Sequence, residues 1–507
     1  MKRLIYFLIP FFIFGFLGWE NKAIPDNQLV LLPVEEDPTI SFRIWFKVGS
    51  QNDPRGKEGL AYLTSQMLVQ GSTLSKSYEK ILEELYPMAA RYSAQVDKEM
   101  VVITGRVHKD NLEQYYQLLK EAIFTPAFDE KDFQRIKSEA LNYLEKYLRY
   151  ADEEELGKAA LYEFIFQGTP YQHPNIGYVN SLKSITIQDV KEFYNKYFIR
   201  DNVMLGLAGG FDDKFVKEVK EDFAQLPPGE PTPVAPPQAE EIKGFEVLIV
   251  QKPTNSTAIS MGFPVEILRG DEDFYPLVLV NSWLGEHRNS SSHLYQVIRE
   301  ARGLNYGDYS YIEHFPMGGR RQFPPPNVAR RQQIFEIWIR PVESKYGHFA
   351  ARAAVRELTK LVDHGLSREA FKLTKEFLRK YYLHYAPTLD YKLGYMMDDV
   401  FYGISGNYLQ LLPQKLADLT LEQVNQTIKK HLQDKNIKIV FVTQDAEGLK
   451  KALIEDLSSP ITYRTPKSQE ILEEDKEIIK FPMKVSPEHI HIIKVSDIFE
   501  KPLKELL

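Results

Sequence analysis

Polar and apolar residues along the chain follow two periods. WFKVGS from Trp45 and MVVITGRV from Met100 alternate between apolar and polar positions, which is typical of strands with one buried face. The stretches FDEKDFQRIKSEALNYL from Phe128 and LSREAFKLTKEFLRKYY from Leu366 have apolar residues three and four apart, which predicts amphipathic helices. This order of strands and helices favours an α+β fold with a mostly antiparallel sheet covered by helices.

The same order of elements occurs twice. Three pairs of segments correspond, in the same sequence order: residues 39–41 with 258–260, the helices from 128 and from 366, and 185–190 with 419–424. The last pair consists of capped helix starts that each run on into an apolar strand. The ordered set predicts two tandem homologous domains that arose by duplication.

A proline-rich stretch separates the two halves. LPPGEPTPVAPPQ from Leu226 contains six prolines, so we expect it to be extended and unable to join a sheet interior. The predicted organisation is an N-terminal address segment at 1–22, a first domain at 23–226, a linker at 227–244, a second domain at 245–459, and a charged tail at 460–507.

Composition narrows the class of protein. The 507 residues carry a net charge of −7, spread along the chain, which does not suggest nucleic-acid binding. The absence of cysteine excludes disulfides, thiol catalysis and thiolate metal sites. Lys2 and Arg3 precede an apolar run, Leu4–Trp19, that is shorter than the roughly 20 residues of a membrane-spanning helix. This layout predicts export to the periplasm or cell envelope, with the segment either removed or kept as an anchor.

A glycine-led helix gives the first family resemblance. VGSQNDPRGKEGLAYLTSQMLVQGS from Val48 resembles the pitrilysin/insulinase family of zinc peptidases, which includes the mitochondrial processing peptidase. In that family the helix reads roughly GLAHxxEHM and carries the inverted zinc motif HxxEH. The two histidines share a helix face and bind one zinc, and the glutamate acts as general base on the zinc-bound water. The resemblance covers most of residues 30–450 and implies that the two domains form half of a clamshell enclosing peptides.

The zinc chemistry of this motif is lost here. Its three positions hold Tyr62, Ser65 and Gln66. A tyrosine keeps its proton near neutral pH, serine is no general base, and glutamine offers only a neutral amide. For the family's third ligand, a glutamate further along the chain, Glu145 is the closest match and Glu139 the alternative; an exposed charge on a helix is the simpler interpretation. We therefore expect no metal in this chain.

A second element of the family is kept. HLYQVIREARGLNYGDYSYIEHF from His293 resembles the family's REKRGLAY element, and Arg299 and Tyr306 reproduce its Arg-to-Tyr spacing of seven positions. In the family this pair reaches across the cavity to the zinc site of the opposite half and stabilises the tetrahedral oxyanion, a role that a guanidinium and a phenol suit. Without the resemblance, the local sequence predicts only an exposed arginine and a sheet-packed tyrosine. Arg302 is a neighbouring alternative with the wrong spacing.

Two further stretches depart from the family's pattern, the substrate-pairing strand and an insertion. Ser93, Ala94 and Gln95 occupy the family's substrate-pairing strand, which usually opens with Asn-Ala-x-Thr, so the side chains depart from the pattern. Pairing through the main chain would need only free backbone groups. The insertion at 316–333, MGGRRQFPPPNVARRQQ after Pro316, has no counterpart in the resemblance. It suits a mobile loop at the cavity mouth, a subunit contact or an unused surface loop.

Three functions fit these features. The first is a partner subunit whose Arg299 and Tyr306 complete the zinc site of a homologous HxxEH chain in a heterodimer, with peptides as substrates and membrane contact only through the N-terminal segment. The second is a structural or assembly subunit, and the third is a protein that binds peptides without cleaving them. The retained Arg/Tyr pair favours the first.

Overall fold

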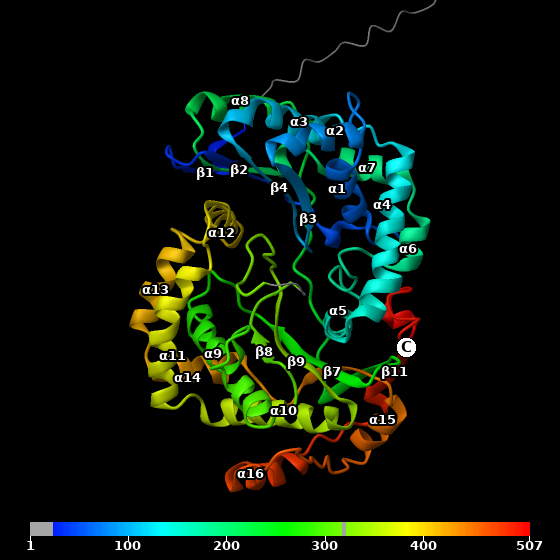
Figure 1. Ribbon diagram of the computed structural model, residues 1–507, viewed down its shortest axis with the longest axis vertical. Coiled ribbons are helices and arrows are strands. Elements are labelled where there is room, and N and C mark those ends of the chain that lie inside the picture. Colours follow the sequence, from blue (N-terminus) through cyan, green and yellow to red (C-terminus); the bar gives the residue numbers. More distant parts are fainter. Residues whose placement is uncertain (1–23, 317–320) are drawn as a thin grey trace, which may run out of the picture.

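The structure is a computed structural model that describes residues 24–316 and 321–507, and two sheets form the centres of its two halves (Figure 1). The N-terminal sheet has the order β1-β5-β2-β4-β3, and its strands are β1 (Leu29–Pro33), β2 (Thr39–Phe46), β3 (Arg91–Val96), β4 (Val101–His108) and β5 (Val203–Gly209). The C-terminal sheet has the order β11-β6-β10-β7-β9-β8, and its strands are β6 (Phe245–Gln251), β7 (Ser256–Val265), β8 (Asp308–Tyr311), β9 (Gln333–Glu343), β10 (Ile437–Thr443) and β11 (Ile490–Lys494).

The two sheets share one topology. β1 pairs with β5 in parallel, as β6 does with β10, and the pairs that follow in each sheet are antiparallel. β11 adds a further parallel strand beside β6. The helices α7 (Ile187–Tyr197) and α14 (Leu421–His431) occupy corresponding places and both begin with a threonine capping box. The predicted duplication and the mostly antiparallel α+β fold are confirmed.

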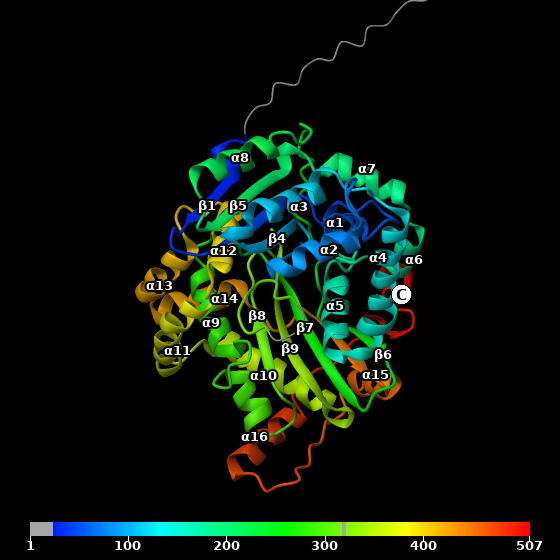
Figure 2. The same ribbon diagram turned by 45° about the horizontal axis from the view of Figure 1, so that its top comes forward.

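Helices cover one face of each sheet, as Figure 2 shows for the N-terminal half. The other helices of that half are α1 (Leu60–Gln70), α2 (Tyr78–Leu85), α3 (Leu112–Phe124), α4 (Glu130–Asn142), α5 (Glu153–Ile165), α6 (Val179–Ser184) and α8 (Asp213–Phe223). Those of the C-terminal half are α9 (Phe274–Gly285), α10 (Gly347–His364), α11 (Arg368–Tyr381), α12 (Leu389–Tyr402), α13 (Tyr408–Asp418), α15 (Ala446–Ile454) and α16 (Gln469–Ile479). Between these halves, residues 227–243 form neither helix nor strand.

Each half lends one helix to the sheet of the other. α5 packs on β7 and β10 of the C-terminal sheet, and α12 packs on β1, β2 and β5 of the N-terminal sheet (Figure 1). Leu393 and Met397 of α12 share a buried cluster with Trp45, Val102 and Met204 of the N-terminal half. Because both sheets bury apolar surface against the opposite half, the two halves form one unit.

The insertion links the two halves. Arg330 Nε donates to Asp97 Oδ1 at 2.6 Å, and both residues are 2% exposed. Arg331 donates to Glu99 from its backbone N (2.7 Å) and its Nε (2.5 Å). The described part of the insertion, residues 321–332, is therefore an interdomain strap. It is not an unused surface loop.

The predicted charged tail is also part of the folded body. α16 packs on α10, and Arg302 bonds to it through Asp475 (2.8 Å) and Glu474 (2.7 Å). After β11 the chain crosses to the N-terminal half, where Arg149 donates to Glu500 at 2.8 Å. The segment 460–507, predicted as a charged tail, thus adds a strand to the C-terminal sheet and contacts both halves.

The predicted address segment at 1–22 lies outside the described residues. Across residues 24–316 and 321–507, no helix combines the length and the apolar character needed to cross a membrane.

Candidate functional site

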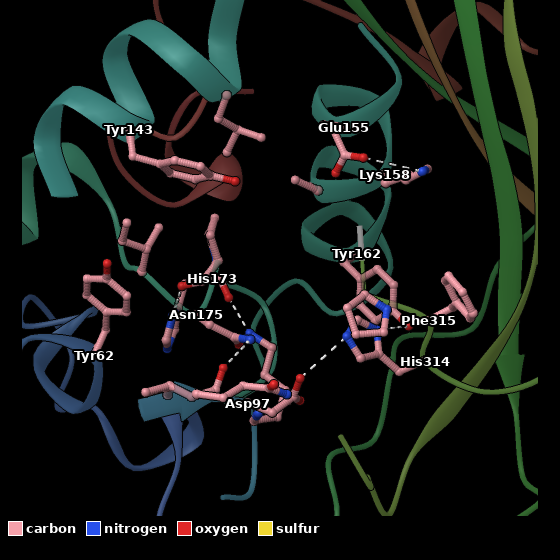
Figure 3. A pocket seen from close by; sticks show the side chains of 18 of the residues that line it. Tyr62, Asp97, Tyr143, Glu155, Lys158, Tyr162, His173, Asn175, His314 and Phe315 are labelled. Carbon is pink, nitrogen blue, oxygen red and sulfur yellow. Dashed lines mark hydrogen bonds and ion pairs between the residues drawn. The ribbon is translucent and has the colours of Figure 1, made fainter. Parts of the chain in front are cut away.

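A cavity of about 920 Å³ lies between the N-terminal half and the strap (Figure 3). Its walls come from α1, β3, α5 and the π-helical segment η5 (Tyr143–Ala151). The carboxylate of Asp53 fixes the start of α1 by accepting from the backbone N of Gly59 and of Ala61, each at 2.7 Å. Gly59 has φ = 101°, a conformation that glycine adopts without strain and that lets the chain turn into the helix. α1 therefore directs its zinc-motif positions at this cavity or its wall.

Two of the three zinc-motif side chains form hydrogen bonds within the chain, and the third faces the cavity. Tyr62 lines the cavity, and burial together with the nearby Glu139 charge raises its pKa, so it stays a neutral phenol. Ser65 is fully buried and donates to the Tyr62 carbonyl at 2.8 Å. Gln66 donates to the Ala94 carbonyl at 3.3 Å and accepts from Gln70 at 2.8 Å. A neutral phenol, a buried hydroxyl and a committed amide do not fit a zinc ion.

The predicted substrate strand, β3, is an edge strand of the N-terminal sheet. Alternate residues of an edge strand turn their backbone groups to the open side. Here the carbonyls of Ala94 and Val96 accept from side chains, namely Gln66 (3.3 Å) and Asn175 (3.1 Å). The Gln95 side chain donates to the Asn327 carbonyl of the strap at 3.4 Å, while Ser93 is exposed. Free backbone pairing along this edge, which the sequence leaves open, is thus reduced at two carbonyls.

The structure distinguishes the two candidate glutamates. Glu145 is turned away from the cavity and pairs with Lys183 at 3.4 Å. Glu139 lines the cavity, and its charge acts on Tyr62. Of the two candidates, Glu139 is the one that faces the motif. Glu139 lies in α4 and Glu145 in η5, and at about 100° per residue their separation already places the two side chains on different faces of a helix.

Arg299 and Tyr306 lie outside this cavity, on the C-terminal half. Arg299 belongs to the π-helical segment η7 (Tyr295–Glu300), and its side chain is 36% exposed and donates to Glu300 at 2.7 Å. Tyr306 precedes β8 and is 78% exposed, so it is not packed on the sheet. The alternative, Arg302, is 3% exposed and holds α16. Of the two arginines, Arg299 is the more exposed.

Sequence reasoning missed one end of the cavity. Tyr143 and Tyr147 of η5 and Glu155 of α5 line it. Figure 3 shows Tyr143 and Glu155 facing the same space as Tyr62. Burial raises the pKa of Glu155 to about 7, against the lowering effect of Lys158. The spacing of four between the tyrosines was visible in the sequence, but their approach to Glu155 depends on how η5 and α5 meet.

Within the described residues, no group of three or more His, Cys, Asp or Glu side chains is arranged to hold a metal. Two models of one family match the sequence: insulinase (peptidase family M16) over residues 29–177, and the peptidase M16 inactive domain over residues 184–378. The chain belongs to the insulinase (M16) family. It has the family's two domains and lacks the zinc-binding side chains at the motif positions.

Some of the similar proteins are named as zinc proteases and others as inactive or non-peptidase homologues. The uncharacterized zinc protease YmxG of Bacillus subtilis (strain 168) is 24% identical over 57% of this chain and 69% of its own length. The non-peptidase homolog YmxG of Helicobacter pylori is 22% identical over 86% of this chain and 98% of its own length. The crystal structure of a peptidase M16 inactive domain from Pseudomonas fluorescens superposes with a TM-score of 0.72 at 22% identity, covering 87% of this chain and 97% of that one. These M16 likenesses support the two-domain clamshell fold.

Proposed function

We propose that this chain is the non-zinc subunit of an exported two-chain metallopeptidase and is inactive alone. A homologous chain with an HxxEH motif would hold the zinc and enclose peptides together with this one. The observation that carries the proposal is the contrast between the two inherited elements. Ser65 and Gln66 of the motif are hydrogen-bonded within the chain and Tyr62 is a neutral phenol in the cavity wall, whereas Tyr306 is 78% exposed.

The chemistry of the exposed pair supports the same role. Arg299 offers a permanent cation with a planar set of donors, and Tyr306 offers a phenol donor. Donors placed against a developing oxyanion in a closed site typically contribute about 10²–10³-fold in kcat each. Exposure in the free chain suits residues that act on a partner's site across an interface.

The test is co-expression with an exported homologue that carries HxxEH. The purified complex should hydrolyse peptides, and Arg299→Ala or Tyr306→Phe should lower kcat by about 10²-fold with little change in KM. Arg464→Ala and Tyr86→Phe are matched controls, because the Arg464 side chain is 92% exposed and Tyr86 is 87% exposed elsewhere on the surface. Zinc-dependent hydrolysis by the isolated chain, or a complex indifferent to both substitutions, would refute the proposal.

An inert structural subunit is the second candidate. The occupied carbonyls of Ala94 and Val96 favour it, since a chain that closes its own strand edge has less use for an added peptide strand. This candidate predicts a stable complex whose activity is the same with native Arg299 and Tyr306 as without them. The same kinetic comparison therefore separates the two functions.

A further inference from the structure

A second cavity lies in the C-terminal half, at the end of α9. Its volume is about 40 Å³, which is room for a few water molecules or one small ion. α9 packs among α11, α13 and α14, and the cavity lies where this helix ends at Gly285 (Figure 1). Its lining includes Glu286 directly after α9, Tyr385 beyond α11 and Tyr408 at the start of α13. It is separate from the cavity of the zinc-motif positions, because Phe315 is the one residue that lines both.

Glu286 is a buried carboxylate without a cation. It is 6% exposed, and within the part of the chain that the structure describes no lysine, arginine or histidine forms an ion pair with it. Burial raises its pKa to about 7, against a lowering effect of the Ser282 hydroxyl. The adjacent His287 does not supply the charge, because burial lowers its pKa to about 3 and its ring nitrogens contact the Tyr311 hydroxyl and the Arg321 carbonyl. The negative charge of Glu286 is therefore unbalanced.

The end of α9 adds to this negative charge. The carbonyl groups in the last turn of a helix carry a partial negative charge, which cations stabilise. The last turn of α9 contains no basic residue, and Glu286 itself occupies the C-cap position. Glu313, the other acidic residue of the lining, is already paired with Arg269 at 2.8 Å. A single positive charge would thus balance the cavity.

Two tyrosine hydroxyls provide further oxygen atoms. Tyr385 and Tyr408 are almost fully buried, and neither hydroxyl has a hydrogen-bond partner among the residues of the described ranges. The charge of Glu286 acts on Tyr385, which shows that the two groups are close. Asn281 lines the same space, and its Oδ1 accepts from Ser310 at 2.9 Å. A carboxylate, phenol oxygens and an amide oxygen around a small cavity suit a cation that takes oxygen ligands.

We propose that this cavity binds one monovalent cation, an alkali-metal ion or ammonium. The ion would contact the Glu286 carboxylate and the hydroxyls of Tyr385 and Tyr408. One carboxylate balances one positive charge, so a monovalent ion leaves the buried site neutral and a divalent ion would not. Bound there, the ion would link the end of α9 to the start of α13. The site belongs to the free chain and is independent of a zinc partner and of Arg299 and Tyr306.

The test compares melting temperatures of the full chain in different chloride salts at pH 8, above the pKa of Glu286. Potassium, rubidium and ammonium chloride are each compared with tetramethylammonium chloride at the same concentration, because the tetramethylammonium ion is too large for the cavity. A cation that binds the folded chain stabilises it by mass action. At about ten times its dissociation constant, the bound ion should raise the melting temperature by about 1–2 °C.

Substitutions locate the effect. Glu286→Gln should abolish the shift, and in tetramethylammonium chloride it should melt no lower than the native chain, because it removes an unbalanced buried charge. The double substitution Tyr385→Phe and Tyr408→Phe should reduce the shift, since it removes two of the oxygen ligands. Glu155→Gln is the matched control and should keep the full shift, because Glu155 is equally buried but has Lys158 as its partner.

The salts also identify the ion. A shift in potassium and rubidium chloride assigns the site to an alkali-metal ion, and a shift in ammonium chloride alone assigns it to ammonium. If rubidium stabilises the chain, crystals soaked in rubidium chloride should show an anomalous peak beside the Glu286 carboxylate, and Glu286→Gln should remove it. Equal melting temperatures in all four salts, a shift that survives Glu286→Gln, or a stabilising rubidium ion located outside this cavity would overturn the proposal.

Discussion

Asp97→Asn changes one atom of the side chain and should markedly lower the free energy of unfolding. Burial alone would raise the pKa of the Asp97 carboxyl, but the Arg330 guanidinium and His314 hold this pKa well below its usual range. The substitution keeps the shape and removes the charge, which leaves the Arg330 guanidinium buried at 2% exposure without an anion. Breaking one partner of a buried pair costs about 3–5 kcal/mol, and an asparagine oxygen can still accept, so we expect about 3 kcal/mol.

The measurement is urea unfolding followed by tryptophan fluorescence. Trp45 and Trp338 are both buried, one in each half, so the transition reports on both. Arg330→Met in the Asp97→Asn background should recover part of the loss, because it removes the unpaired cation. Glu83→Gln breaks an exposed pair and should cost less than about 0.5 kcal/mol.

A loss below about 1 kcal/mol for Asp97→Asn would refute the view that the strap holds the halves together through a buried ion pair. An additive double variant would refute the coupling as well. Digestion with trypsin, which cleaves after arginine, is an independent check. Arg330 is buried and Arg331 is paired, so cleavage after them requires the strap to open and should be faster in Asp97→Asn.

Two further outcomes are expected. Removal of residues 495–507 should destabilise the chain by up to about 4–9 kcal/mol in urea unfolding, since three fully buried apolar side chains are lost, those of Ile498, Phe499 and Leu503. The triple substitution Tyr62→His, Ser65→Glu and Gln66→His restores HxxEH and should create zinc affinity, measurable by competition with a chromophoric chelator. In that background Glu139→Gln should lower the zinc affinity, because Glu139 lines the cavity, while Glu145→Gln should not.

Most of the fold can be predicted from local patterns in the sequence. Alternation and helical spacing predict the strands and helices, and the proline-rich stretch predicts the division, because each is recorded in neighbouring residues. Loss of the zinc motif is visible for the same reason, since a single side chain decides whether a position can bind metal. The repeated threonine caps at Thr186 and Thr420 show how far such local signals extend across the duplication.

Contacts between distant segments could not be predicted in this way. Arg330 and Asp97 are 233 positions apart, and a buried arginine has the same letter as an exposed one. That α5 and α12 each pack on the sheet of the opposite half depends on tertiary packing. An apolar helix face predicts burial but does not show which sheet will bury it.

The loss of zinc and the closing of the strand edge are connected through Gln66. In the family's motif this position holds a histidine that points at the metal, and here the glutamine amide turns to the Ala94 carbonyl of the neighbouring edge strand. An unpaired edge carbonyl beside a cavity is a site for unwanted strand addition, and a side-chain amide is a small group that blocks it. Gln66 thus replaces a bond to metal with a bond to the sheet. A chain with this substitution has less capacity to pair a further strand at this edge.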